Sequence, residues 1–291
     1  MLLSKETNLL ARRLGYEGAI RKISAAGFDA FDMSFFPMQY DDNDEFLKDG
    51  YKKSAMKLRK IADECNVICN QAHAPFPSSF GDDEKDEIMF KKIVRSMEIA
   101  SILGAKIIVV HPKQHLDYSV KGNPEKLKKM NYEFYTRLIP YCEKFNIKVA
   151  TENMFQHDKN RNYLVKSTCA SAAEFKEYVD MCNSKWIVAC VDIGHMALVG
   201  QDFDEMFDTL GSRIAALHVH DNNYIKDLHT LPFSGKLDFN TVTAALKRIG
   251  YNGVFTFEAD NFLEPIPTEL LDSALEFMQQ TGRYLIKCIT E

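Results

Sequence analysis

The 291-residue sequence lacks several features that would each place it in a particular class of proteins. Its seven cysteines form no Cys-x-x-Cys pair and are odd in number, a pattern that suits a reducing compartment. No apolar stretch approaches about 18 residues, and the first fifteen residues contain no continuous apolar segment. We therefore expect neither a membrane span nor a signal peptide, and we expect a cytoplasmic location.

Concentrated positive charge and nucleotide-binding motifs are also missing. The sequence has 36 Lys and Arg against 41 Asp and Glu, which gives a formal net charge of −5. The densest basic group, Lys126, Lys128 and Lys129, has the spacing of a solvated helix face. A duplex-binding enzyme usually carries a concentrated basic footprint, so the composition does not favour a nucleic acid partner. Neither a P-loop nor a Gly-x-Gly-x-x-Gly motif occurs, and we expect no nucleotide cofactor.

What the sequence does contain is a regular alternation of strand-like and helix-like segments, with no Gly/Ser-rich or Pro-rich linker. Short aliphatic and β-branched runs predict strands near residues 1–5, 28–33, 67–72, 106–110, 147–151, 187–191, 214–219 and 254–257. Amphipathic stretches between them predict helices near 15–26, 51–65, 84–103, 124–145, 171–182, 203–211, 239–249 and 268–286. Eight strands alternating with eight helices predict an α/β fold, a single (β/α)₈ TIM barrel in one domain over residues 1–291.

Histidines and carboxylates stand where the predicted strands end. They are His73, His111, Glu152, Asp192, His218 with His220, and Glu258. In barrels of this type the chemistry lies at the carboxyl ends of the strands and in the loops that follow. We therefore expect these side chains to meet at one mouth of the barrel. Two longer segments, Phe35–Asp49 and Phe155–Thr168, are rich in aromatic and polar residues and could cover a pocket there.

The strand-end residues predict a metal site. Several inward-pointing carboxylates at one mouth would repel one another without a cation. We predict a divalent ion held by Glu152, Asp192, Glu258 and a histidine of the seventh strand, where His218 and His220 share the same parity. An oxygen-rich ligand set suits Mn²⁺, Mg²⁺ or Co²⁺, and Zn²⁺ fits where imidazoles dominate.

A further group of residues could bind additional metal ions. Asp227 and His229 have the spacing Asp-x-His, which lets both side chains reach one ion. His195 could join them or hydrogen-bond a substrate hydroxyl. His73 and His111 supply imidazoles from the third and fourth strands.

Six segments of the sequence resemble the xylose-isomerase-like TIM-barrel superfamily. They are Ala72-His73-Ala74-Pro75-Phe76, Val110-His111-Pro112, Thr151-Glu152-Asn153, Val191-Asp192-Ile193-Gly194-His195, His218-Val219-His220-Asp221-Asn222 and Asp227-Leu228-His229. That superfamily includes sugar-phosphate isomerases and epimerases, ketose 3-epimerases, and AP endonucleases of the endonuclease IV type (AP endonuclease family 2). The resemblance covers nearly the whole chain, and its motifs are specific for the superfamily rather than for one activity within it.

Two assignments follow from the resemblance. The ketose 3-epimerases imply one metal at Glu152, Asp192, a seventh-strand histidine and Glu258. In this assignment His73, His195, Asp158 and Lys226 contact substrate, although Asp158 and Lys226 depart in residue type from that family. The endonucleases imply three ions: one at His73, His111 and Glu152, a second at Glu152, Asp192, His218 and Glu258, and a third at His195, Asp227 and His229. The two families point to different members of the His218/His220 pair.

The function that we predict is isomerisation or epimerisation of a sugar or sugar phosphate by proton transfer next to a carbonyl. A divalent ion would stabilise the enediolate, while Glu152 and Glu258 remove and return the proton. The alternative is metal-dependent phosphodiester hydrolysis at abasic DNA sites, which the full ligand set favours and the net acidity opposes. A binding or scaffold barrel without catalysis is the least favoured reading. The resemblance also implies a homo-oligomer.

Overall fold

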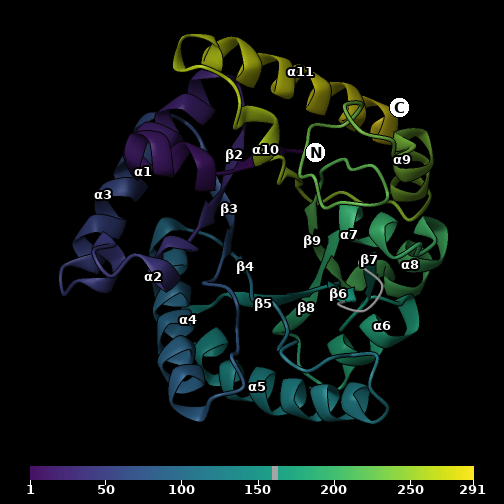
Figure 1. The fold of residues 1–291 in the computed structure, drawn as a ribbon. Coiled ribbons are helices and arrows are strands. Elements are labelled where there is room, and N and C mark those ends of the chain that lie inside the picture. Colours follow the sequence, from purple (N-terminus) through teal and green to yellow (C-terminus); the bar gives the residue numbers. More distant parts are fainter. Residues whose placement is uncertain (159–162) are drawn as a thin grey trace.

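Eight parallel strands form a barrel that a ring of helices surrounds (Figure 1). The computed structural model describes residues 1–158 and 163–291. The strands are β1 (Leu3–Glu6), β2 (Ala30–Ser34), β3 (Ile68–His73), β4 (Ile107–Val109), β5 (Lys148–Glu152), β8 (Ile187–Asp192), β9 (Ile214–His218) and β10 (Phe255–Phe257). They are hydrogen-bonded in the order β10-β1-β2-β3-β4-β5-β8-β9, and a parallel bridge between Val219 and Phe257 brings the two ends together. The predicted TIM barrel is confirmed.

The interior of the barrel is built from small side chains that stand two residues before the strand ends. Ala150, Cys190 and Ala216 belong to one buried apolar cluster, together with Val109 and Val188. Because side chains alternate along a strand, the residues two positions further on point the same way. These residues are the strand-end side chains of β5, β8 and β9, so the pleat directs them into the barrel mouth above a floor of small residues.

The helices form the outer layer and bury their apolar faces against the strands. They are α1 (Asn8–Ala25), α3 (Tyr51–Glu64), α4 (Asp83–Leu103), α5 (Asn123–Phe145), α6 (Ala172–Asp180), α8 (Phe203–Leu210), α9 (Phe239–Arg248) and α11 (Leu271–Thr290). The first begins at Asn8 rather than near residue 15, because the segment is helical on both sides of a kink at Gly15, where φ is 73°. Among the described residues, no helix has both the length and the apolar character needed to cross a membrane.

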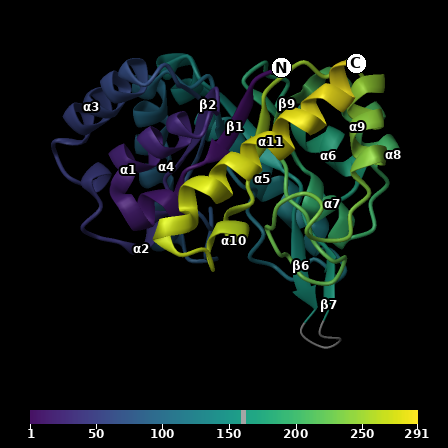
Figure 2. The same ribbon diagram turned by 90° about the horizontal axis from the view of Figure 1, so that it is seen from above.

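Shorter elements lie in the loops. The helices α2 (Pro37–Tyr40), α7 (Ile193–Leu198) and α10 (Asp260–Leu263) and the 3₁₀ turns at Glu45–Leu47 and Thr268–Leu270 follow strands, on the side of the barrel mouth, whereas a 3₁₀ turn at Gly211–Arg213 leads into β9 at the opposite end. The segment expected as a loop after the fifth strand instead contains an antiparallel hairpin of β6 (Phe155–Asp158) and β7 (Tyr163–Lys166). It projects away from the barrel (Figure 2). Its pairing supplies the backbone hydrogen bonds that a strand outside the barrel needs.

Candidate functional site

Four strand-end side chains form a buried group, here called the central cluster. It consists of Glu152 at the end of β5, Asp192 at the end of β8, His218 at the end of β9 and Glu258 just after β10. One nitrogen or oxygen atom from each lies within 4.8 Å of the atoms from the other three. His218 Nδ1 is 3.3 Å from Glu152 Oε2 and 3.1 Å from Glu258 Oε2. Three carboxylates and one imidazole therefore converge on one point.

The electrostatics of the central cluster favour a cation at that point. Burial, and next the charge of Glu152, raise the pKa of Glu258 well above its ordinary value. Burial acts to raise the pKa of Glu152 too, but His218 and other imidazoles lower it to about 2. Both carboxylate oxygens of Glu152 and Nδ1 of His218 are buried and make no hydrogen bond. Buried polar atoms without partners indicate a binding site, and a divalent ion fits this set of donor atoms.

His73 and His111 flank the central cluster on the side of β3 and β4. His111 Nε2 lies 3.3 Å from Glu152 Oε2, and His73 Nε2 lies 3.6 Å from Glu258 Oε1. Burial lowers the pKa of His111 to about 4, which leaves a neutral imidazole able to ligate a metal. His73 differs: burial opposes its protonation, but Asp32 lies 2.9 Å from its Nδ1 and raises its pKa to about 9.

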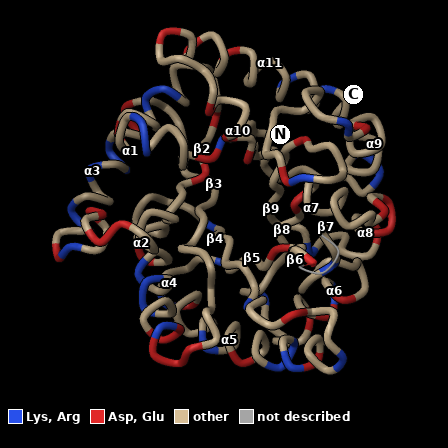
Figure 3. The backbone as a smooth tube through the Cα atoms, in the orientation of Figure 1, with Lys and Arg blue, Asp and Glu red and all other residues tan. Residues whose placement is uncertain are grey.

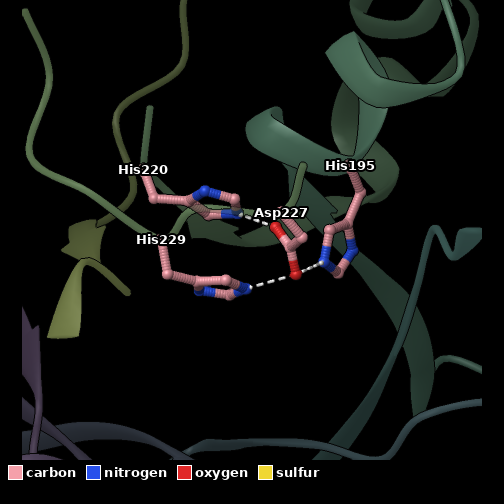
Figure 4. A group of neighbouring side chains, drawn as sticks. All are labelled: His195, His220, Asp227 and His229. Carbon is pink, nitrogen blue, oxygen red and sulfur yellow. Dashed lines mark hydrogen bonds and ion pairs between the residues drawn. The ribbon is translucent and has the colours of Figure 1, made fainter. Parts of the chain in front are cut away.

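A second group of side chains, here called the histidine cluster, lies beside the first. It consists of His195, His220, Asp227 and His229, whose ligand atoms all lie within 4.8 Å of one another. Figure 4 shows the Asp227 carboxylate between the three imidazoles. Its oxygens lie 2.8 Å from His229 Nε2, 3.7 Å from His195 Nε2 and 3.9 Å from His220 Nε2. Three imidazoles and one carboxylate form a donor set typical of Zn²⁺ and related transition metals.

Local structure links the two clusters. Asp192 caps α7, where its carboxylate accepts a hydrogen bond from the backbone N–H of His195. The same carboxylate lies 3.0 Å from His220 Nε2, so it contacts both clusters. Gly194 provides the room for His220, because a Cβ at that position would lie 1.9 Å from the imidazole. Asn153 pairs with the backbone of Asp192 through both its amide oxygen and its amide nitrogen.

Both clusters open into a cavity of about 510 Å³, a size in the range of small-molecule sites. Phe36, Phe76 and Phe155 supply apolar surface. The polar lining residues are Glu6, Asn8, His111, Gln114, Glu152, Gln156, His157, His195, Asp227, His229, Glu258, Asp260 and Asn261. Among the described residues, no Lys or Arg lines this cavity. Lys and Arg are instead distributed over the outer ring of helices, interleaved with Asp and Glu (Figure 3).

Comparison with known proteins decides the family. Residues 20–281 match the family described as xylose isomerase-like TIM barrel. The chain belongs to this family. An uncharacterized protein of Methanocaldococcus jannaschii is 26% identical over 269 residues, which are 90% of this chain and 85% of that protein. A putative L-ribulose-5-phosphate 3-epimerase, SgbU, of Escherichia coli is 23% identical over 261 residues, which are 86% of this chain and 85% of that protein.

Solved structures share the fold of this xylose isomerase-like barrel. A D-tagatose 3-epimerase-like protein superposes with a TM-score of 0.75 at 21% identity, and the match covers 100% of both chains. The zinc-bound IolI protein superposes with a TM-score of 0.75 at 20% identity, covering 100% of this chain and 98% of the other.

The structure brings most of the predicted site residues together at the mouth of the barrel, but not all of them. It separates the two seventh-strand histidines: His218 lies in the central cluster and His220 in the histidine cluster. His73 and His111 lie beside the central cluster. The two residues assigned to substrate by resemblance alone, Asp158 and Lys226, are not among the residues that line the cavity. Lys226 is exposed, and Asp158 pairs with Tyr163 in the hairpin.

Sequence reasoning missed a buried ionic group on the first two strands of the xylose isomerase-like barrel. Glu6 ends β1, Asp32 lies in β2, and Lys5 pairs with Asp260 at the start of α10. Burial, and next Asp260, raise the pKa of Glu6 to about 8. The signal was present, because Glu6 ends its strand as the predicted ligands end theirs. The predicted first strand ended one residue earlier, at Lys5, so Glu6 was not recognised as a strand-end residue.

Proposed function

We propose that this chain is a divalent-metal-dependent isomerase or epimerase of a small sugar, acting by proton transfer next to a carbonyl. The observation that carries the proposal is the central cluster, which gathers three carboxylates and an imidazole at the floor of a cavity of small-molecule size. The names of two related proteins refer to epimerases of a ketose and of a ketose phosphate, which supports a sugar as the substrate class.

The carboxylates of the central cluster supply the proton-transfer groups. Glu152 ends β5 and Glu258 follows β10, so the two carboxylates reach His218 Nδ1 from different parts of the barrel, and both residues line the cavity. A carboxylate within reach of the proton on a carbon next to a carbonyl can act as a general base, and a second can return the proton. Glu152, Asp192, His218 and Glu258 would hold the metal. When bound, it supplies Lewis-acid stabilisation of the charge that develops on the substrate oxygen.

Other cavity residues would bind and orient the sugar. His195 lines the cavity beside Glu152, with 3.3 Å between His195 Nδ1 and Glu152 Oε1. Gln114 and Gln156 offer amide donors and acceptors on the same wall as the hairpin. The phenyl rings of Phe36, Phe76 and Phe155 exclude water from the reacting atoms, which strengthens electrostatic interactions inside the site.

Metal-dependent phosphodiester hydrolysis is the second candidate, and the histidine cluster is the observation that favours it. Two adjacent metal-binding groups, with His111 beside the first, are the kind of arrangement that activates water and neutralises a leaving oxygen. The lining of the cavity opposes this function, because a DNA backbone needs cationic contacts. We therefore place it second.

One parallel assay separates the two candidates. The purified protein, loaded with Mn²⁺, is incubated with a panel of ketoses and ketose phosphates and, separately, with a duplex that contains an abasic site. Conversion of a sugar with exchange of a carbon-bound proton for solvent deuterium supports the proposed function. Cleavage of the duplex without conversion of any sugar overturns it and selects the hydrolytic function.

A further inference from the structure

The charged end of a sugar phosphate would need a cationic or N–H-rich pocket at the barrel mouth. In TIM barrels phosphate groups are commonly held by the loops after the seventh and eighth strands and by helix amino termini. The described residues that line the cavity include neither Lys nor Arg. Among the described residues, two places in this mouth have the chemistry of an anion site, and the protein's own carboxylates fill both.

The first filled place is the amino terminus of α1. Asp260 accepts a hydrogen bond of 2.7 Å from the backbone N–H of Leu9, at the start of this helix, and pairs with Lys5 Nζ through its other oxygen. Lys5 is fully buried and also donates to the backbone oxygen of Glu6. A helix amino terminus beside an ammonium group is well suited to a phosphate. Here the carboxylate of Asp260 already occupies it.

The second filled place is the loop after β9, the seventh strand of the barrel. The backbone N–H groups of Gly235, Lys236 and Leu237 all point at the buried carboxylate of Asp221, with hydrogen bonds of 2.9, 3.0 and 3.0 Å. Successive N–H groups converging on one point form an anion-binding nest. A Cβ at Gly235 would lie 2.3 Å from Asp221 Oδ1, so the loop is closed tightly around this internal carboxylate.

Beside the first filled place the wall of the cavity offers oxygen atoms that can accept hydrogen bonds. Glu6 Oε1 and Asn8 Oδ1 are buried and have no hydrogen-bond partner, and both residues line the cavity. An alcohol O–H can donate to either atom, whereas the phosphate group of a sugar phosphate, as a dianion, carries no proton that it could donate to them. Gln114 and Gln156, which also line the cavity, carry no charge.

We infer that the substrate is an unphosphorylated polyhydroxy compound, whose hydroxyls bind to Glu6 and Asn8, and that sugar phosphates are excluded because Asp260 and Asp221 fill the anion sites. This inference rests on the proposed function for the reaction but concerns the binding of substrate. It narrows the substrate class from sugars in general to free ketoses.

Binding of analogues that cannot react tests the inference separately from catalysis. The full chain, loaded with Mn²⁺, is titrated calorimetrically with D-arabinitol and with D-arabinitol 5-phosphate, which both lack a carbonyl group. We expect the free polyol to bind at least about tenfold more tightly than its phosphate ester. Equal or tighter binding of the ester, or no binding of either compound, overturns the inference.

The titrations, taken together with the turnover assay on ketoses and ketose phosphates, distinguish failure of the inference from failure of the proposed function. Preferred turnover of ketose phosphates over free ketoses refutes the inference while the proposed function stands. Tighter binding of the free polyol without turnover of any sugar supports the inference while the proposed function fails.

A pair of matched variants tests the role of Asp260. Replacement by Asn (D260N) releases Lys5 and the N–H of Leu9, so inorganic phosphate should gain affinity by about tenfold over wild type. D272N changes an exposed aspartate that also pairs with a lysine, and should leave phosphate binding unchanged. A folded D260N protein that gains no phosphate affinity contradicts the assignment. If D260N does not fold, the comparison of the two arabinitol ligands in wild type still decides.

Discussion

Replacement of Glu258 by Gln (E258Q) should stabilise the metal-free protein and destroy its response to metal. The ligand atoms of Glu152 and Glu258 lie within 4.8 Å of each other in a buried site. At an effective dielectric constant of about 20, two negative charges at that separation repel by about 3.5 kcal/mol. Wild type carries either this repulsion and the cost of burying the charge or the cost of keeping Glu258 protonated; the amide removes these costs but introduces N–H groups that need partners, so we expect a net gain of about 1–3 kcal/mol without metal.

The pH dependence of that gain identifies its origin. The pKa of Glu258 in the folded protein is raised by burial and by Glu152, above its ordinary value of 4.5. Because the carboxyl pKa is higher in the folded than in the unfolded protein, wild type keeps its full free energy of unfolding below pH 4.5. It loses part of this free energy as the pH rises from 4.5 toward the pKa of the folded protein. The E258Q variant should therefore be the more stable protein at pH 7, and should match wild type at about pH 4.

Calorimetric unfolding with a chelator, and then with Mn²⁺, measures both effects. For a chain of this length a gain of 1–3 kcal/mol corresponds to a rise in Tm of about 2–5 °C. Wild type should gain further stability from Mn²⁺ by mass action, whereas E258Q should gain little because it has lost an anionic ligand. E276Q, which changes an exposed glutamate on α11, serves as the control. A metal-free E258Q protein that is less stable than wild type at pH 7 would refute the charge-crowding argument.

Three further predictions concern the two clusters. E152Q should lower kcat for sugar conversion by about 10²–10⁴-fold while circular dichroism remains native, and an unchanged rate would remove the proton-transfer assignment. Because the pKa values of His195 and His229 are raised to about 10 and 9, chiefly by Asp192 and Asp227 against the effect of burial, the metal-free protein holds protons there at pH 7.5. Metal binding at the histidine cluster should release them, and binding heats that are equal in two buffers of different ionisation enthalpy would contradict this. G194A should force His220 aside, lower stability by about 1–3 kcal/mol and reduce the bound metal measured by elemental analysis, and normal metal content would count against the site.

The barrel could be predicted from the sequence because two signals indicate most of the buried strands. A short aliphatic run gives the position of the strand, and a polar residue gives its end. The segment 187–191 was expected as a strand, and β8 spans Ile187–Asp192 with every residue buried. Helix positions follow from the same alternation, because a parallel strand needs a crossover to its neighbour.

The division of the two seventh-strand histidines could not be predicted from the sequence. His218 and His220 share parity, but two residues of strand advance by about 6.6 Å. Regular pairing of β9 also ends at His218, so His220 follows the chain toward Asp227 and His229. The imidazoles of His220 and His229 stack with their centroids 3.9 Å apart. The distance along the strand, rather than its pleat, assigns each histidine to its cluster.

The hairpin after β5 was missed for a different reason. Its strands, Phe155–Asp158 and Tyr163–Lys166, pair only with each other and are mostly half-buried or exposed. A hydrophobic pattern appears in a sequence only where one face is buried. These strands lack such a face, so the segment looked like an ordinary polar loop with aromatic residues.

Charge compensation at the barrel mouth determines both where a metal ion can bind and which substrates fit. Asp260 has its own cation in Lys5, and Asp221 is neutralised by backbone N–H groups, so neither needs anything from outside the chain. Glu152 and Glu258 share the imidazole of His218, and the described residues show no Lys or Arg paired with either carboxylate. An incoming dication is therefore drawn to this pair, while an incoming phosphate finds the anion sites occupied. A neutral polyol suits this site, because some of its oxygens can bind the ion while its other hydroxyls donate to Glu6 Oε1 and Asn8 Oδ1, which have no partners in the protein.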